Sequence, residues 1–283
     1  MTNYDALLRN ALYWGDTFDD IIDLYEKYLR QLGTVADINH ANAINSFHRA
    51  CNNKTLLKDL RSYFKELNNL FENENLMIYG RRKAFVSYEA KLRKYLEDGR
   101  DADDVRDVFA FRVVLLENNS RGSIIKLYKM TERIIDYFTK SLGLTVHDWG
   151  LEEHIKIRKE YAKFNISAHP ELILPRKQFL TEENIPYVKD YIRFPKSNGY
   201  QSLHLLFKTP KGVFFEIQLR TLSQHAFNEA EDGSWKNYKK NKYPMYPRFN
   251  PKKIQIPGFI VSSNGIPFDT TGLIVPKEIL RRS

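Results

Sequence analysis

Residues 188–221 read VKDYIRFPKSNGYQSLHLLFKTPKGVFFEIQLRT, and the second half of this stretch predicts a β-hairpin. SLHLLFKT (202–209) and VFFEIQLRT (213–221) are strand candidates, and PKG (210–212) supplies the turn between them. The two-residue period of a strand sends the side chains of the last strand to opposite faces: Phe215, Ile217 and Leu219 against Glu216, Gln218 and Arg220. The polar face is either a solvent face or a site face, and periodicity alone favours solvent.

The segments around the hairpin predict a mixed β-sheet flanked by helices, an α/β (α+β) fold. YVKDYIRF (187–194), LMIYG (76–80) and VRDVFAFRVVLLE (105–117) are further strand candidates, and SNGY (197–200) is a turn. Residues 4 to about 72 place apolar residues at three- and four-residue intervals, which predicts a helical N-terminal layer. Later helices are expected at about 84–97, 123–141, 151–163 and 222–239. The stretch of about 142–186, which contains the helix at 151–163, is otherwise irregular and reads as a surface insertion.

Composition limits the class of protein. The 283 residues are 42% hydrophobic, which is enough for a globular core. The sequence contains no run of about 18 apolar residues and no secretory signal pattern, so we expect a cytoplasmic protein without a membrane partner. Cys51 is the only cysteine, which excludes a disulfide framework and a Cys-based zinc site.

The formal net charge of +9 is concentrated at the C-terminal end. From Lys236 onward there are ten Lys and Arg residues and two acids, whereas the preceding residues carry 34 basic and 33 acidic side chains. Prolines recur throughout 241–283 and exclude one long helix there. Residues 240–283 therefore read as a basic, Pro-rich extension.

Three residues of one segment could hold phosphate groups. Lys83, Ser87 and Lys91 are spaced four apart, so in a helix they would share one face. Two ammoniums and a hydroxyl near a helix N-terminus, whose amides also favour anions, would suit a phosphate. For this segment alone, a solvated basic face is the better interpretation.

Asp107 and Glu216 are candidate metal ligands, since two carboxylates brought together would suit Mg²⁺. Asp107 alone could equally be a turn or edge residue. It precedes Arg112 by five positions, so a shared site requires a bulge or a strand that starts after Asp107. Tyr200 could stack on a base, with His204 four residues later, although a lone Tyr or His more often serves packing.

Five segments together resemble the consecutive motifs of the RelA/SpoT synthetase family, in the same order: GRRKAFVSYEAKLRK (80–94), DVFAFRVVL (107–115), VKDYIRFPKSNGYQSLHLLF (188–207), FEIQLRT (215–221) and HAFNEAEDGSWKNYK (225–239). The pair NGYQSLH and EIQLRT is highly specific. The resemblance implies a nucleotidyltransferase-like synthetase core over residues 76–239. A helical region, 1–75, precedes this core, and the extension 240–283 follows it.

The resemblance also implies a role for each matching residue. ATP would be bound by Arg81, Lys83, Ser87, Lys91 and Arg112, with the two arginines on either side of the adenine. Asp107 and Glu216 would be catalytic and would hold Mg²⁺. The acceptor nucleotide would be bound by Tyr200, His204, Gln218 and Arg220.

The implied reaction is transfer of the β,γ-pyrophosphate of ATP to the 3′-hydroxyl of GDP or GTP, which makes (p)ppGpp. A toxic small alarmone synthetase is the alternative, acting on the 3′ end of tRNA or on adenine nucleotides and restrained by an antitoxin or by its own C-terminal segment. The basic extension suits tRNA. A third hypothesis is a regulator that binds nucleotides with an inactive site. It is less favoured, because every carboxylate and phosphate-binding position of the motifs is occupied by the matching residue. HDWGLEE (147–153) lacks the other metal-binding residues of the family's hydrolase half, so no alarmone hydrolysis is expected.

Overall fold

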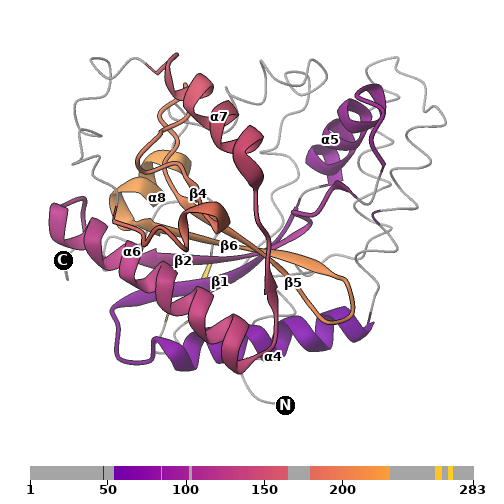
Figure 1. The fold of residues 1–283 in the computed structure, drawn as a ribbon. Helices are drawn as coiled ribbons and strands as arrows, with labels where there is room; N and C mark the ends of the chain where they lie inside the picture. The colour runs from indigo at the N-terminus through magenta and orange to yellow at the C-terminus, as the bar shows by residue number, and fades with distance from the viewer. Residues whose placement is uncertain are drawn as a thin grey trace.

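A computed structural model describes residue 47 and residues 54–83, 85–101, 104–164, 179–229, 259–262 and 267–269 (Figure 1). The helices are α4 (Lys54–Leu70), α5 (Phe85–Glu97), α6 (Arg121–Asp136), α7 (Gly150–Tyr161) and α8 (Leu222–Glu229), with a π-helical turn η2 (Tyr137–Ser141) and a 3-10 turn η5 (Ile185–Tyr187). The strands are β1 (Leu76–Arg82), β2 (Phe109–Leu115), β3 (Thr145–Val146), β4 (Lys189–Asp190), β5 (Leu203–Lys208), β6 (Phe214–Thr221), β7 (Phe259–Ser262) and β8 (Pro267–Asp269).

The described strands form one mixed sheet in the order β3-β5-β6-β2-β1-β7-β8, and β4 also pairs with β5. Strands β2 and β6 run parallel, whereas the other pairings are antiparallel. The predicted mixed sheet with flanking helices is therefore confirmed. None of the described helices combines the length and the apolar character needed to cross a membrane.

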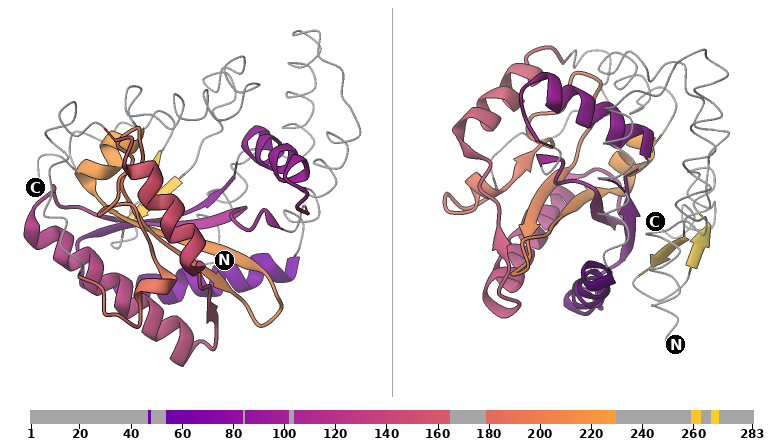
Figure 2. Two further views of the ribbon diagram at one scale, coloured as in Figure 1. Left: turned by 45° about the horizontal axis from the view of Figure 1, so that its top comes forward. Right: turned by 90° about the vertical axis from the view of Figure 1, so that its right-hand side faces the viewer.

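The helices lie in two layers. Helices α4 and α6 cover one face of the sheet, whereas α5 and α7 stand over the opposite face, on either side of it (Figure 1, Figure 2). Apolar side chains from α4, α6 and the strands form one buried core, which includes Leu60, Phe64, Leu67, Ile124, Leu127, Ile134, Phe111 and Val113. The core thus supports one face of the sheet, whereas the opposite face carries a small second apolar cluster, which includes Met77 and Val114, beside the polar side chains of β6.

Strand β6 shows how the sequence divides the two faces. Phe215, Ile217 and Leu219 are fully buried in the core, as the alternation predicts. The Phe215 ring stacks on Tyr63 of α4, with ring centroids 5.4 Å apart, and on Phe207 of β5, at 5.8 Å. Glu216 and Gln218 are also less than a tenth exposed. The polar face is therefore not the solvent face that periodicity alone favoured.

Two predicted strands are shorter than expected. β2 begins at Phe109 rather than at 105, so Asp107 lies before the strand. Within 187–194 only Lys189–Asp190 is a strand. The chain turns there because the Asp190 carboxylate accepts hydrogen bonds from the backbone amides of Ile192 (3.2 Å) and Arg193 (2.8 Å), and such local bonds compete with a strand ladder.

The segments outside the central motifs also contribute to the fold. Part of the predicted insertion joins the sheet, because β3 pairs with β5 through Thr145 and Lys208. In the C-terminal extension, β7 pairs with β1 through Met77↔Ser262 and Ile78↔Val261. Helix α4 confirms the helical prediction over its own length. The predictions for 4–46 and for the closing helix after Glu229 lie outside the described residues.

We expect Phe215→Ala to lower the free energy of unfolding by about 3–5 kcal/mol, because it removes a fully buried ring that stacks on two others. Phe214→Ala is the matched control: Phe214 is only half-buried and points to the opposite face. Urea unfolding followed by circular dichroism measures both losses. Equal losses in the two variants would contradict the assignment of the faces.

Candidate active site

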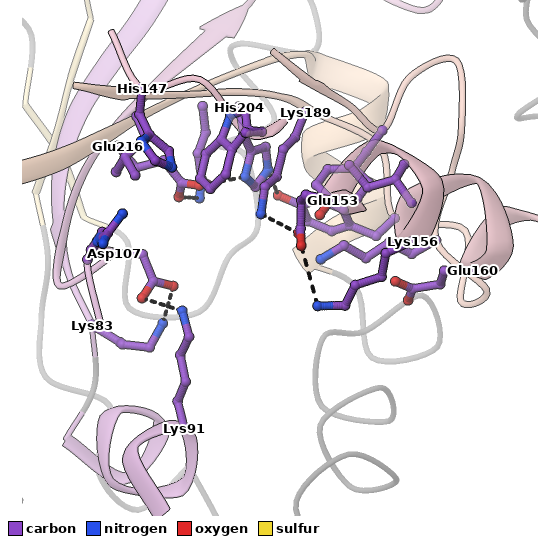
Figure 3. A pocket seen from close by; sticks show the side chains of 18 of the residues that line it. Lys83, Lys91, Asp107, His147, Glu153, Lys156, Glu160, Lys189, His204 and Glu216 are labelled. Atoms are coloured by element: carbon purple, nitrogen blue, oxygen red, sulfur yellow. Dashed lines mark hydrogen bonds and ion pairs between the residues drawn. The ribbon is translucent and has the colours of Figure 1, made fainter. Parts of the chain in front are cut away.

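A cleft of about 490 Å³ lies on the polar face of the sheet and is lined from both α5 and α7 (Figure 3). Ten Lys and Arg side chains and six carboxylates are among its described lining residues, so the cleft has a basic excess that suits a polyanion. Nine of the predicted site residues line it: Lys83, Lys91, Asp107, Arg112, Tyr200, His204, Glu216, Gln218 and Arg220. Arg81 belongs to β1 and Ser87 to α5, and their side chains lie outside the described part of the structure.

Asp107 is held between two lysines. Its carboxylate accepts from Lys83 Nζ at 2.6 Å and from Lys91 Nζ at 2.9 Å. Burial would raise the pKa of Asp107, but the two ammoniums outweigh it and hold the pKa well below its usual range. Burial likewise opposes the charge of Lys91, and Asp107 reverses this effect, so the pKa of Lys91 is raised. Asp107 is therefore ionised at neutral pH.

Because β2 starts only at Phe109, Asp107 lies before the strand and can face Lys83 and Lys91. A strand that starts after Asp107 was one of the two arrangements, with a bulge, that would let Asp107 and Arg112 share a site. The backbone amide of Lys83 donates to Val108 O at 2.7 Å and so fixes the end of β1 beside Asp107. The predicted helical face of Lys83, Ser87 and Lys91 was wrong for Lys83, because α5 begins at Phe85. Lys83 reaches the site from the connection before the helix, and Lys91 reaches it from the helix itself.

Glu216 forms a second buried centre. Its carboxylate accepts from His204 Nδ1 at 2.7 Å and from Gln218 Nε2 at 2.5 Å. Burial alone would raise the pKa of Glu216, but the His204 ring and the Gln218 amide bring it down to about 2. Burial lowers the pKa of His204, so its ring is neutral at pH 7. Because an ionised carboxylate can only accept, we assign the ring proton to Nδ1.

The Glu216 centre belongs to a longer row of hydrogen bonds. Tyr200 OH lies 2.8 Å from His204 Nε2, and with the proton on Nδ1 the hydroxyl is the donor. On the other side, Arg112 Nε donates to Gln218 Oε1 at 3.3 Å and Arg112 Nη1 donates to Tyr79 OH at 2.7 Å.

The register of the sheet explains this row. His204 is paired with Gln218, Gln218 with Arg112, and Arg112 with Tyr79, so these side chains are successive cross-strand neighbours on one face. Tyr79 was not among the predicted site residues. No local signal marks it, because its partner Arg112 is set only by the pairing of β1 with β2.

Arg220 lies two residues beyond Gln218 on the same strand and is fully buried. Its charge acts on Tyr200: burial raises the pKa of the Tyr200 hydroxyl, and Arg220 and Arg112 oppose that rise. Tyr200 therefore stays protonated at neutral pH. It can donate its hydrogen bond to His204.

A group of residues on and beside α7 was also missed. Glu153 accepts from Lys189 Nζ at 2.6 Å and from Lys156 Nζ at 3.4 Å, and all three line the cleft. The ammonium of Lys189 also lies 3.7 Å from the centre of the Trp149 ring. Lys189 is part of the VKDYIRF motif and could have been noticed there. Glu153 gave no signal, because its helix was assigned to a surface insertion.

The described residues include no group of three or more His, Cys, Asp and Glu side chains placed to hold a metal ion. The carboxylates of Asp107 and Glu216 are the described groups that would hold a divalent cation in this cleft. They are close enough for the charge of Asp107 to oppose the lowering of the Glu216 pKa. A hard cation such as Mg²⁺ prefers carboxylate oxygens and would relieve this repulsion.

We expect Glu216→Gln to flatten the loss of stability in acid. Because the pKa of folded Glu216, about 2, lies below its ordinary value of 4.5, the ionised form stabilises the fold. This contribution is present above pH 4.5 and is lost as the pH falls toward 2. Chemical unfolding at a series of pH values measures the slope, and the exposed Glu152→Gln is the control. An unchanged slope in Glu216→Gln would contradict the lowered pKa.

Comparison with known proteins identifies the family. Residues 80–243 match the family model described as "Region found in RelA / SpoT proteins". The GTP diphosphokinase CRSH1 of rice chloroplasts (Oryza sativa subsp. japonica) is 27% identical over 170 residues, which are 59% of this chain and 22% of that protein. A guanosine-3′,5′-bis(diphosphate) 3′-pyrophosphohydrolase of Spiroplasma citri is 26% identical over 172 residues, 60% of this chain and 16% of that protein.

The match covers only part of those relatives, since the chain spans about a fifth of their length. Among solved structures, small alarmone synthetase 2 from Bacillus subtilis is 19% identical, with a TM-score of 0.37 over 71% of this chain and 85% of that one. The family model covers more than half of this chain and includes the strands and α5 that build the cleft. The chain therefore belongs to the family of RelA/SpoT proteins.

Proposed function

We propose that this chain transfers the β,γ-pyrophosphate of ATP to the 3′-hydroxyl of a guanosine nucleotide, GDP or GTP. The observation that carries the proposal is one basic cleft in which Asp107 and Glu216, both ionised, lie near each other beside lysine and arginine side chains. Membership of the RelA/SpoT family and a relative named a GTP diphosphokinase support the same reaction.

The reaction requires the acceptor 3′-oxygen to form a bond to the β-phosphorus of ATP. The bond from that phosphorus to the oxygen bridging it to the α-phosphate breaks, AMP leaves, and the hydroxyl proton is released. With a pKa of about 2, Glu216 is a weak base, so its role is to accept a hydrogen bond from the hydroxyl and orient it. This is sufficient because phosphoryl transfer passes through a loose transition state that needs little prior deprotonation.

In this proposal ATP and the acceptor nucleotide bind at different ends of the cleft. Lys83 and Lys91, with Arg81, Ser87 and Arg112, serve the ATP side, where ammoniums stabilise charge on the triphosphate. Mg²⁺ held by Asp107 and Glu216 would supply further neutralisation of that charge. Tyr200 serves the acceptor side, with His204, Gln218 and Arg220 around it.

The hydrogen-bonded row gives these residues a fixed geometry. His204 stands between Tyr200 and Glu216 and bonds both. A base stacked on the Tyr200 ring would therefore be linked to the carboxylate that orients its own 3′-hydroxyl. Gln218 holds the other oxygen of Glu216, so this carboxylate cannot rotate away from the cleft without losing a buried hydrogen bond.

A second candidate is transfer to the 3′ end of tRNA, as in toxic small alarmone synthetases. The observation that favours it is the charge of the C-terminal segment, with ten basic residues and two acids from Lys236 onward. Such a segment would supply sequence-independent affinity for RNA phosphates. An antitoxin or the segment itself would then restrain the activity.

The test is to incubate the protein and Mg²⁺ with γ-labelled ATP and, separately, with GDP, GTP, ADP or deacylated tRNA. We expect label in GDP or GTP, and we expect Glu216→Gln to abolish the transfer while its unfolding profile at pH 7 shows that it is folded. Label in tRNA alone would favour the second candidate. Label in no acceptor would contradict both.

A separate prediction concerns the Tyr200 ring and hydroxyl. Tyr200→Ala should weaken acceptor binding by roughly 1–3 kcal/mol, the usual size of base–aromatic stacking, and leave ATP binding nearly intact. Tyr200→Phe keeps the ring but loses the bond to His204, so it should preserve acceptor KM better than kcat. Steady-state kinetics with each substrate varied in turn measure this. If the KM for the acceptor rose equally in Tyr200→Ala and Tyr200→Phe, stacking on the ring would be ruled out.

A further inference from the structure

The cleft contains two groups of the same composition, each a carboxylate between two lysines. One is Asp107 with Lys83 and Lys91, and the other is Glu153 with Lys189 and Lys156. Figure 3 shows them on different sides of Glu216 and His204. Only the first group is used by the proposed transfer, so the second needs its own explanation.

The Glu153 group lies on the acceptor side of the cleft. Lys189 is the cross-strand partner of His204, which bonds both Tyr200 and Glu216. Its ammonium is within reach of His204 electrostatically, since it helps lower the pKa of that ring. A phosphate group of an acceptor that stacks on Tyr200 would therefore meet Lys189.

Glu153 already engages that lysine. The Lys189 side chain is 15% exposed and its contact with Glu153 is short, at 2.6 Å, whereas Lys156 is 74% exposed and lies at 3.4 Å. The ion pair of Glu153 with Lys189 therefore contributes more to the free energy than its pair with Lys156, because an exposed ion pair contributes little. Burial raises the pKa of Glu153, but the two lysines lower it to about 2, so the carboxylate is charged at any physiological pH.

We propose that Glu153 is a specificity-determining residue that occupies the lysine subsite as an internal anion and competes with the phosphate groups of the acceptor. A carboxylate and a phosphate recognise an ammonium by the same charge, and the two anions repel each other when both approach it. Each additional acceptor phosphate meets more of this repulsion. The wild-type cleft therefore gains less affinity from added phosphates than its lysines alone would give. This inference rests on the proposed function, because it takes the acceptor to be a guanosine nucleotide.

The experiment measures equilibrium binding of guanosine, GMP, GDP and GTP, without ATP, to the full chain. We expect Glu153→Gln to bind GTP roughly threefold more tightly than the wild type, to bind GMP with a smaller gain, and to bind guanosine unchanged. Glu152→Gln is the matched control, since Glu152 is exposed on the same turn of α7 and does not line the cleft. It should match the wild type for all four ligands.

A second variant tests whether the gain acts through Lys189. In a Lys189→Met background, Glu153→Gln should give no gain for GTP, because no ammonium is released there. Thermal unfolding of each variant checks that it is folded. Weaker binding of every nucleotide by Glu153→Gln would overturn the inference, since it would make Glu153 a residue that positions Lys189. An equal gain for guanosine, or no gain at all, would also overturn it.

The binding experiment and the transfer assay can fail independently of each other. A graded gain in binding without any labelled product would support the competition by Glu153 and contradict the proposed transfer. Labelled product with unchanged binding in Glu153→Gln would do the reverse. Failure of wild type and Glu153→Gln alike to bind any of the four ligands would count against both.

Discussion

The parallel pairing of β2 with β6 is the constraint on which the site depends. It sets Arg112 beside Gln218 and Ala110 beside Glu216, and the antiparallel neighbours then add Tyr79 on one side and His204 on the other. A shift of one residue would exchange the two faces of a strand, and would drive Phe215 into the cleft and Glu216 into the core. The apolar core under the sheet therefore holds the polar side chains of the cleft in register.

The polar row stays stable because its described members supply one another's hydrogen bonds. An unsatisfied buried polar group costs about 1–3 kcal/mol, so a half-paired row would be expensive. Here Gln218 accepts from Arg112 and donates to Glu216, and His204 donates to Glu216 and faces Tyr200. The same bonds that stabilise the fold keep Glu216 ionised and fixed in position. Stability and preorganisation of the proposed catalytic carboxylate thus have one physical origin.

The sequence could predict the sheet, the alternation of β6 and the need for β2 to start late after Asp107, because these depend on local periods and spacings. It could not decide between a solvent face and a site face for Glu216, since that depends on helices distant in the sequence. It misplaced Lys83 on a helix because spacing does not show where a helix begins. Tyr79 and Glu153 were out of reach for a similar reason: their partners, Arg112 and Lys189, are 33 and 36 residues away along the chain.

In the proposed reaction the cleft takes two polyanions, and each group of lysines that would meet them is already paired with a carboxylate. Unpaired lysines packed this closely would repel one another, and the carboxylates offset this repulsion before any nucleotide binds. The arriving phosphates must then compete with those carboxylates, so part of their attraction to the cleft is offset. At Asp107 a divalent cation could offset this competition, because Asp107 and Glu216 line the same cleft and their charges act on each other. Glu153 lines the cleft with its lysines, and its main charged partners are Lys189 and Lys156. Its competition with phosphate would persist, and this makes it suited to set acceptor preference.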